Sequence, residues 1–238
     1  MAYSLIAIRR SFGDLLVLDG VDIEIPPSQL LVILGPSGCG KTTLLKIVAG
    51  LDPAFEGRRE GFERARFSFV FQDHRLLPWK SAVENALFAL SGSGLSRAEA
   101  LTRIERYVGL SGLGGHADRP IRELSGGMRQ RASLVRAFAM PADFLLLDEA
   151  FQSVDLKRKR ELMRVFLDLR AMERNVSILV THDPAEAIWL ADRVIVLSDR
   201  PSRVIDAFDV DTPRERREPG TPEVATLERR LNAALLGL

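Results

Sequence analysis

A glycine-rich loop carrying a lysine and a threonine is the first feature of the chain that could do chemistry. Gly35, Gly40, Lys41 and Thr42 fit the spacing G-x-x-x-x-G-K-[ST], between an apolar run at residues 30–34 and a helical stretch. Glycines let consecutive backbone N–H groups turn toward phosphate oxygens, and the following helix N-terminus adds partial positive charge. We expect Lys41 to neutralise the β and γ phosphates of a nucleotide and the Thr42 hydroxyl to coordinate Mg²⁺. The alternative is a plain strand-to-helix turn with a surface lysine.

Two adjacent acids follow a second apolar run. Asp148 and Glu149 come directly after residues 144–147, which read as a buried strand. Such a strand delivers its last side chains to the edge where ligands of open α/β sheets bind. We expect Asp148 to hold Mg²⁺ through water and Glu149 to accept a proton from an attacking water. A hydrophobic strand ending in solvated acids is the alternative, and the phosphate-binding loop in the same chain disfavours it.

Two further polar residues stand at the ends of expected strands. Gln72 follows residues 69–71, and His182 follows residues 178–181. A lone glutamine or histidine is usually structural, but parallel strands would bring these side chains to the same ligand-binding edge. We therefore favour contacts with the γ-phosphate for both.

A second possible anion site begins at Ser125. Ser125 is a good helix N-cap, and Gly126 and Gly127 would leave N–H groups uncovered at the start of a helix expected over residues 128–140. The segment has no Lys-Thr pair, and by itself it fits a simple cap and turn better than an anion site. The residues alone leave both interpretations open.

The elements that position these residues suggest an α/β core with an inserted helical lobe. Short apolar runs rich in β-branched residues, typical of buried strands, occur at residues 15–18, 21–25, 30–34, 67–71, 144–147, 178–180 and 194–197. Between residues 78 and 141 this signal disappears, and helices are expected at 82–90, 96–108 and 128–140. Ser96 followed by Glu99 predicts a capped start for the middle one. Residues 222–238 could form a final amphipathic helix.

Composition narrows the class of protein. The 238 residues carry a net charge of +1, so no general electrostatic case exists for nucleic acid, and the basic run at 157–160 reads as a solvated helix face. We expect neither a membrane span nor an export signal. Cys39 is the single cysteine, which fits a reducing cytosol, and with three histidines it gives no zinc-ligand spacing.

Taken together, these residues resemble the ATPase subunit of ATP-binding cassette transporters over nearly the whole chain. The matching motifs, in order, are Walker A at Gly35 to Thr42, the Q-loop at Gln72, the signature at Leu124 to Met128, Walker B at Phe144 to Glu149, the D-loop at Ser153-Val154-Asp155 and the switch histidine His182. The resemblance implies a P-loop NTPase core with an N-terminal antiparallel β subdomain and an inserted helical subdomain. It implies one cassette domain over 1–238, with the core at about 1–77 and 141–210, the helical subdomain at 78–140 and a tail at 211–238.

The resemblance also implies a set of site residues. Glu149, His182 and Gln72 would be catalytic, and Thr42, Gln72 and Asp148 would hold Mg²⁺. Residues implied to contact ATP in the same chain are Phe12, Val17, Gly35, Pro36, Ser37, Gly38, Cys39, Gly40, Lys41, Thr42, Thr43, Gln72, Asp148 and His182. Residues implied to contact the ATP of a partner subunit are Leu124, Ser125, Gly126, Gly127, Met128 and Asp155.

The partners follow from the same resemblance. Two such subunits, identical ones here, would pair head to tail and close on ATP, with each signature serving the partner's nucleotide. Integral membrane permease subunits would contact the groove near Gln72 and the helical lobe, at the cytoplasmic face of the cell membrane. An extracytoplasmic solute-binding protein would act through them, and no nucleic acid is expected.

Finer marks point to a subfamily. Residues 71–79, 128–131 and 197–201 resemble the ATPases of nitrate, sulfonate and taurine importers. Importers of thiamine-precursor pyrimidines, exporters and lipid-transport systems stay open, while non-transport cassette ATPases and P-loop kinases fit less well. The chain departs from the family at Ala150, where proline is usual, at Gln152 in the D-loop segment, and at Ser28, where a turn glycine is common.

Overall fold

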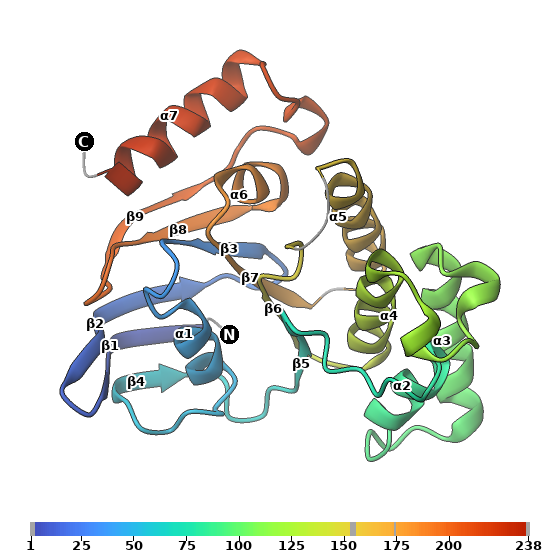
Figure 1. Cartoon of the computed structure of the whole chain (residues 1–238). Helices are drawn as coiled ribbons and strands as arrows, with labels where there is room; N and C mark the ends of the chain where they lie inside the picture. Colours follow the sequence, from blue (N-terminus) through green and yellow to red (C-terminus); the bar gives the residue numbers. More distant parts are fainter. Residues whose placement is uncertain (1–2, 153–155, 174, 237–238) are drawn as a thin grey trace. The chain divides into compact units, whose positions relative to one another are not determined.

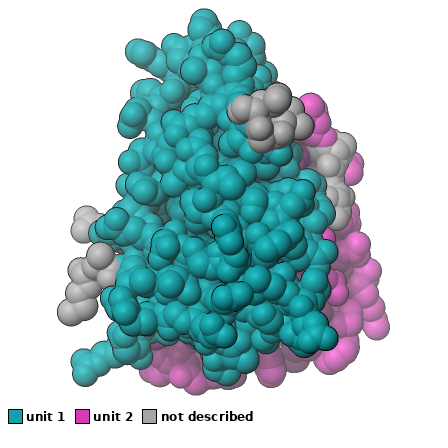
Figure 2. Space-filling view, turned by 90° about the vertical axis from the view of Figure 1, so that its left-hand side faces the viewer, with its two compact units in different colours: residues 1–65, 176–238 teal, residues 66–175 magenta. Residues whose placement is uncertain are grey.

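The structure, a computed structural model, describes residues 3–152, 156–173 and 175–236. Contacts divide the chain into two compact units, described separately below: unit 1 comprises residues 1–65 and 176–238, and unit 2 comprises residues 66–175 (Figures 1 and 2). Within the described ranges, no helix has the length and apolar character needed to span a membrane. The expected α/β class with antiparallel and mainly parallel sheets is confirmed.

Unit 1 is built around a buried, mainly parallel sheet. Its strands lie in the order β7 (Val176–Thr181), β3 (Leu30–Leu34), β8 (Arg193–Leu197) and β9 (Val204–Asp209), with β9 antiparallel. All five residues of β3 are buried, which explains why this strand is a continuous apolar run rather than an alternating one. Helices α1 (Lys41–Val48) and α6 (Pro184–Leu190) follow β3 and β7. The sheet thereby places the phosphate-binding loop and His182 after neighbouring strands.

A three-stranded antiparallel sheet forms the N-terminal part of unit 1. Its order is β2 (Leu15–Ile25), β1 (Tyr3–Phe12) and β4 (Glu56–Glu60). The two apolar runs expected at 15–18 and 21–25 join into the single strand β2, because Gly20 takes a φ of 69° and the pairing with β1 shifts register there. Strand β4 gives no hydrophobic signal, since Glu-Gly-Arg-Arg-Glu is almost wholly exposed. The turn after β2 holds Ser28 at a φ of 61°, a left-handed conformation that favours the glycine common in the family.

The C-terminal part of unit 1 is fixed by arginines. The 3-10 turn η3 (Arg214–Arg216) leads to α7 (Pro222–Leu236), which contacts α6 and β8 (Figure 1). Arg217 is 4% exposed and donates hydrogen bonds to the carbonyl oxygens of Thr212, Ile188, Ala191 and Val210 at 2.6 to 3.1 Å. Burial lowers the pKa of Arg217 to about 10, so its guanidinium stays charged at neutral pH.

Unit 2 combines a parallel strand pair with a group of helices. Strand β5 (Phe67–Val70) pairs with β6 (Phe144–Asp148). The helices are α2 (Ala82–Ala89), α3 (Arg97–Ser111), α4 (Gly126–Ala139) and α5 (Leu156–Ala171), with short 3-10 turns η1 (Gly114–His116) and η2 (Ile121–Glu123). The expected capped start at Ser96 is confirmed, and Ser81 and Glu84 form a second capping box. Hydrogen bonds from Ser81 and Ser96 lower the pKa values of Glu84 and Glu99.

The helices of unit 2 are held together by aromatic packing and one polar cluster. Tyr107, Phe138 and Phe166 are fully buried and pack in sequence, with ring centroids 5.9 to 6.0 Å apart. Arg103 of α3 donates to the carbonyl oxygens of Ala139, at 2.7 Å, and Phe138, at 3.3 Å, near the C-terminal end of α4. These hydrogen bonds fix the C-terminal end of α4 to α3.

Replacing Arg217 by methionine should lower the free energy of unfolding by about 3 kcal/mol, because buried carbonyl groups would lose their donor. Chemical denaturation monitored by circular dichroism measures this loss. Arg216→Met, an exposed neighbour in the same turn, is the matched control and should change stability by less than about 0.5 kcal/mol. Equal stability of the two variants would contradict a structural role for Arg217.

Candidate functional site

The phosphate-binding loop of unit 1 is shaped by a close approach between Gly40 and β2. Gly40 caps α1 with a φ of 109°, and a Cβ atom there would lie 2.7 Å from Val17 Cγ1 and 3.0 Å from Leu18 Cδ2. Gly38 also has a positive φ, of 80°. Both positions favour glycine because of their positive φ, and Gly40 needs it for space as well. Val17, predicted to lie near the nucleotide, packs directly against the loop.

Lys41 lies within the loop rather than on the surface. It is 4% exposed, and its Nζ donates hydrogen bonds to the carbonyl oxygens of Gly35, at 2.8 Å, and Pro36, at 2.7 Å. The side chain therefore spans the loop from the first turn of α1 back to the end of β3. Thr42 and Ser37 are exposed. The arrangement contradicts the alternative of a surface lysine beside a plain turn.

Ser202, to which the sequence alone assigns no role, supports the phosphate-binding loop. Ser202 is fully buried, and its hydroxyl donates to the carbonyl oxygen of Cys39. Its backbone N–H donates to the carbonyl oxygen of Val17 at 2.8 Å. Cys39 is itself 1% exposed. Ser202 thus ties the loop to β2, and no signal in the sequence marks this serine because its partners are backbone atoms distant along the chain.

His182 lies at the same edge of the sheet as the loop. Strands β7 and β3 run parallel with Leu34 opposite Thr181, and Gly35 N–H donates to the carbonyl oxygen of Thr181 at 3.3 Å. His182, the next residue, is exposed. Unit 1 therefore brings His182 and the phosphate-binding loop together, as the strand-end rule predicts.

Phe12 lies at the end of β1 and is 49% exposed. The guanidinium carbon of Arg10 sits 4.0 Å from the centre of its ring. An exposed aromatic face beside a cation can stack on a planar base. The exposure of Phe12 is thus compatible with the ATP contact that the resemblance implies for it.

In unit 2, Gln72 and the acid pair follow paired strands. Val70 lies opposite Leu147, so Gln72 and Glu149 both stand two residues beyond this pair. Gln72 is exposed, whereas Asp148 and Glu149 are half-buried. Glu149 has a φ of 47°, a strained conformation for a residue with a side chain, which costs about 1–3 kcal/mol. Strain of this kind clusters at functional sites.

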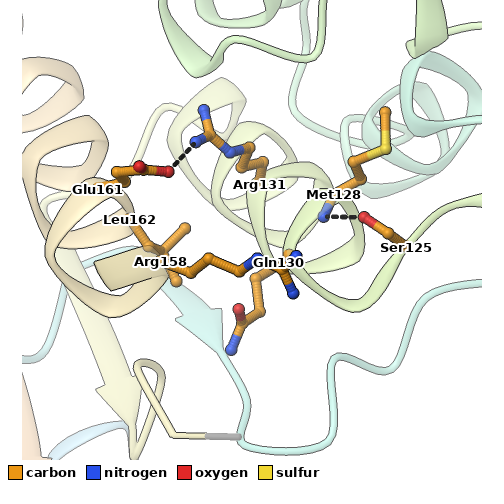
Figure 3. Close-up of a pocket in the computed structure, with 8 residues that line it drawn as sticks. Ser125, Met128, Gln130, Arg131, Arg158, Glu161 and Leu162 are labelled. Atoms are coloured by element: carbon orange, nitrogen blue, oxygen red, sulfur yellow. Dashed lines mark hydrogen bonds and ion pairs between the residues drawn. The ribbon is translucent and has the colours of Figure 1, made fainter. Parts of the chain in front are cut away.

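The signature segment starts helix α4 earlier than expected. The helix begins at Gly126 rather than Met128, because the Ser125 hydroxyl accepts the N–H of Met128 at 3.4 Å and caps the helix. Space around the Cα atoms of Gly126 and Gly127 is open, since an added Cβ would meet nothing within 4 Å. A pocket of about 140 Å³ adjoins this end (Figure 3) and is lined by Ser125, Gly127, Met128, Gln130, Arg131, Arg158, Glu161 and Leu162.

A wider groove of about 350 Å³ occupies another part of unit 2. Aromatic side chains from β5 and α2 line it together with two arginines; the set includes Phe67, Phe69, Phe71, Phe88, Arg75 and Arg136. Arg136 donates to the carbonyl oxygen of Arg75 at 2.7 Å, and burial lowers the pKa of Arg136. The groove combines an apolar floor with positive charge, which suits a protein segment rather than a small metal ion.

Asp155, with Ser153 and Val154, lies outside the described residues. Among the residues that the structure does describe, no three His, Cys, Asp or Glu side chains gather in a way that could hold a metal ion. The Mg²⁺ ligands predicted from the sequence are a hydroxyl, an amide and a single carboxylate, so they would not form a group of three such side chains.

Gly40→Ala should weaken nucleotide binding by about tenfold or more, because the added Cβ would collide with Val17 and displace the loop N–H groups. Titration with a fluorescent ATP analogue measures the affinity. Gly115→Ala is the control, since a Cβ there meets nothing and binding should not change. Normal affinity in Gly40→Ala would mean that the loop does not hold the phosphates.

Comparisons with known proteins agree with this geometry. The family model described as ABC transporter matches residues 18–152. The chain is 41% identical to the aliphatic sulfonates import ATP-binding protein SsuB 2 of Burkholderia cenocepacia, covering 89% of this chain and 80% of the relative. It is 38% identical to SsuB 1 of Mesorhizobium japonicum, covering 99% and 89%.

A solved structure gives the same result. The dimeric structure of a bacterial ABC transporter cassette matches with a TM-score of 0.76 and 25% identity, covering 89% of this chain and all of that one. The family model spans more than half of the 238 residues, and the relatives match nearly end to end. The chain therefore belongs to the ABC transporter family, as one of its ATP-binding ATPase subunits.

Proposed function

We propose that this chain binds and hydrolyses ATP to power the import of small sulfonate-type anions through separate membrane subunits. The observation that carries the proposal is the near full-length similarity to several proteins named as aliphatic sulfonate import ATP-binding proteins. The subfamily marks at residues 71–79 and 197–201 support the same choice. The same subfamily marks resemble those of importers of nitrate and of taurine, which itself carries a sulfonate group.

The phosphate-binding loop would hold the triphosphate of ATP. Its N–H groups and the buried ammonium of Lys41 supply the positive potential that phosphate oxygens require. Lys41 Nζ is held by the carbonyl oxygens of Gly35 and Pro36, and a phosphate bound in the loop would interact with the same ammonium group. We propose that the adenine stacks on Phe12 and that Val17 packs near the base.

The donor set fits one hard divalent cation. Thr42 offers a hydroxyl, Gln72 an amide oxygen and Asp148 a carboxylate, and oxygen ligands are those that Mg²⁺ prefers. A bound Mg²⁺ would neutralise and orient the β and γ phosphate oxygens. Thr42 and Gln72 are exposed, and Asp148 is half-buried, so each can reach a ligand supplied by solvent or nucleotide.

We infer that Glu149 accepts the proton of the attacking water. Its carboxylate follows the buried strand β6, and its left-handed backbone directs the chain sharply after Asp148. His182 and Gln72 would contact the γ-phosphate and the water, since a histidine and an amide can both donate to the developing charge. As the oxygen of this water bonds to the γ-phosphorus, the bond from that phosphorus to the β–γ bridging oxygen would break, and ADP would leave.

The signature end of α4 would act on the nucleotide of a second, identical subunit. Ser125 and the open backbone at Gly126 and Gly127 leave the positive end of the helix accessible to an anion. We propose that Leu124, Met128 and Asp155 complete this contact in trans. Because both sets of phosphate contacts form only in the closed dimer, ATP would favour closure and hydrolysis would release it.

Membrane permease subunits would dock on the groove lined by Phe67, Phe69, Phe71 and Phe88. Trp79 is 64% exposed and Phe88 62% exposed, an arrangement suited to burial by a partner. We propose that the subunit sits at the cytoplasmic face of the cell membrane. An extracytoplasmic solute-binding protein would select the cargo.

Glu149→Gln should lower turnover of ATP by on the order of 10² to 10⁴ because the neutral amide cannot accept the proton, while ATP still binds and dimers accumulate. Steady-state hydrolysis and size-exclusion chromatography with ATP measure both effects. Glu105→Gln, an exposed carboxylate on α3, is the control and should keep full turnover. Near-normal hydrolysis by Glu149→Gln would refute the role of this carboxylate.

Cargo can be tested in proteoliposomes that contain this chain with the membrane subunits and binding protein from neighbouring genes. Short alkanesulfonates should stimulate ATP hydrolysis severalfold or more over the unloaded system, because only loaded binding protein drives closure. Nitrate, taurine and a thiamine-precursor pyrimidine serve as comparison solutes. Stimulation by the pyrimidine alone, or by no solute, would contradict the sulfonate proposal.

A further inference from the structure

Gln130 is a buried amide on the second turn of α4, and the proposed function assigns it no role. Its side chain is 4% exposed, and its amide nitrogen donates a hydrogen bond of 2.7 Å to the backbone oxygen of Gln152. In Figure 3 the Gln130 amide extends away from Arg131 and Glu161, which pair with each other. Gln130 thus connects the helix that begins at the signature to a segment just after β6.

That segment is the turn that holds Glu149. The N–H of Gln152 donates to the carbonyl oxygen of Glu149 at 3.3 Å, which closes the turn around the left-handed Glu149. Phe151, fully buried, anchors the turn in the core with its ring 5.5 Å from that of Phe166. A strained backbone conformation persists only where its surroundings fix it. Phe151 fixes the turn on one side and the Gln130 amide on the other.

A purely space-filling role explains Gln130 poorly. Its Oε1 is buried and has no hydrogen-bond partner within the part of the chain that the structure describes. A half-satisfied buried amide is less favourable than an apolar side chain of the same size. The contact made by its nitrogen is therefore the feature that distinguishes glutamine from methionine at this position.

We propose that Gln130 is a positioning residue for Glu149. Its hydrogen bond to Gln152 holds the turn so that the Glu149 carboxylate meets the attacking water, and it joins this turn to the helix that contacts the partner's nucleotide. This inference rests on the proposed function, in which Glu149 is the base and Ser125 acts in trans. Engagement of the signature by a partner would then be passed to the base through one hydrogen bond.

The test compares full-length wild type with Gln130→Met, which keeps the volume and removes the donor, and Gln130→Glu, which places an acceptor against the Gln152 oxygen. Misplacing the base should lower kcat for ATP by on the order of 10 to 100-fold, while KM for ATP stays within about twofold. Arg103→Leu is the control: it removes hydrogen bonds at the opposite end of α4 and should lower the melting temperature but not kcat. Unchanged kcat in both Gln130 variants, or an equal loss in Arg103→Leu, would overturn the proposal.

A double-mutant cycle adds a readout that a merely structural role would not move. In a Glu149→Gln background, Gln130→Met should reduce the single-turnover rate by less than about twofold, because the group that it positions is gone. A full multiplicative loss would overturn the proposal. A wild-type chain without ATP hydrolysis would instead contradict the proposed function, so the two failures can be told apart.

Discussion

The burial of one lysine ammonium against backbone carbonyl groups is the interaction on which unit 1 depends. Lys41 is 4% exposed, and its Nζ is held by Gly35 and Pro36. A buried charge is tolerated only where hydrogen bonds satisfy it, and the loop supplies carbonyl groups for this purpose. The loop can do so only because β3 is buried on both faces and delivers Gly35 at a fixed place.

The same constraint explains the packing around the loop. Gly40 lies so close to Val17 that no side chain fits, and Ser202, which is hydrogen-bonded to Val17, also bonds the carbonyl oxygen of Cys39. These contacts hold the loop against β2. The antiparallel sheet, which supplies Val17, therefore helps to shape the phosphate-binding loop.

In unit 2, packing and hydrogen bonds fix the backbone conformation of Glu149. Glu149 sits in a left-handed conformation that the turn to Gln152 and the buried Phe151 maintain. Helix α4, mounted on α3 through Arg103, carries both the open glycines of the signature and the amide of Gln130. Helix α4 thus connects the open backbone at Gly126 and Gly127 to the turn that holds Glu149.

The sequence by itself determined the family, the phosphate-binding loop, the order of the motifs and the capped helix at Ser96, because these depend on local spacing and periodicity. It did not reveal β4, whose residues are charged and exposed, nor the roles of Ser202 and Arg217, whose partners are backbone atoms brought close by folding. The tertiary structure alone decided that Lys41 is buried, that Glu149 is left-handed and that Gln130 reaches Gln152. The contact between Gln130 and Gln152 joins residues 22 positions apart, and the conformations of Lys41 and Glu149 depend on the packing around their loops. Neither leaves a periodic trace in the sequence.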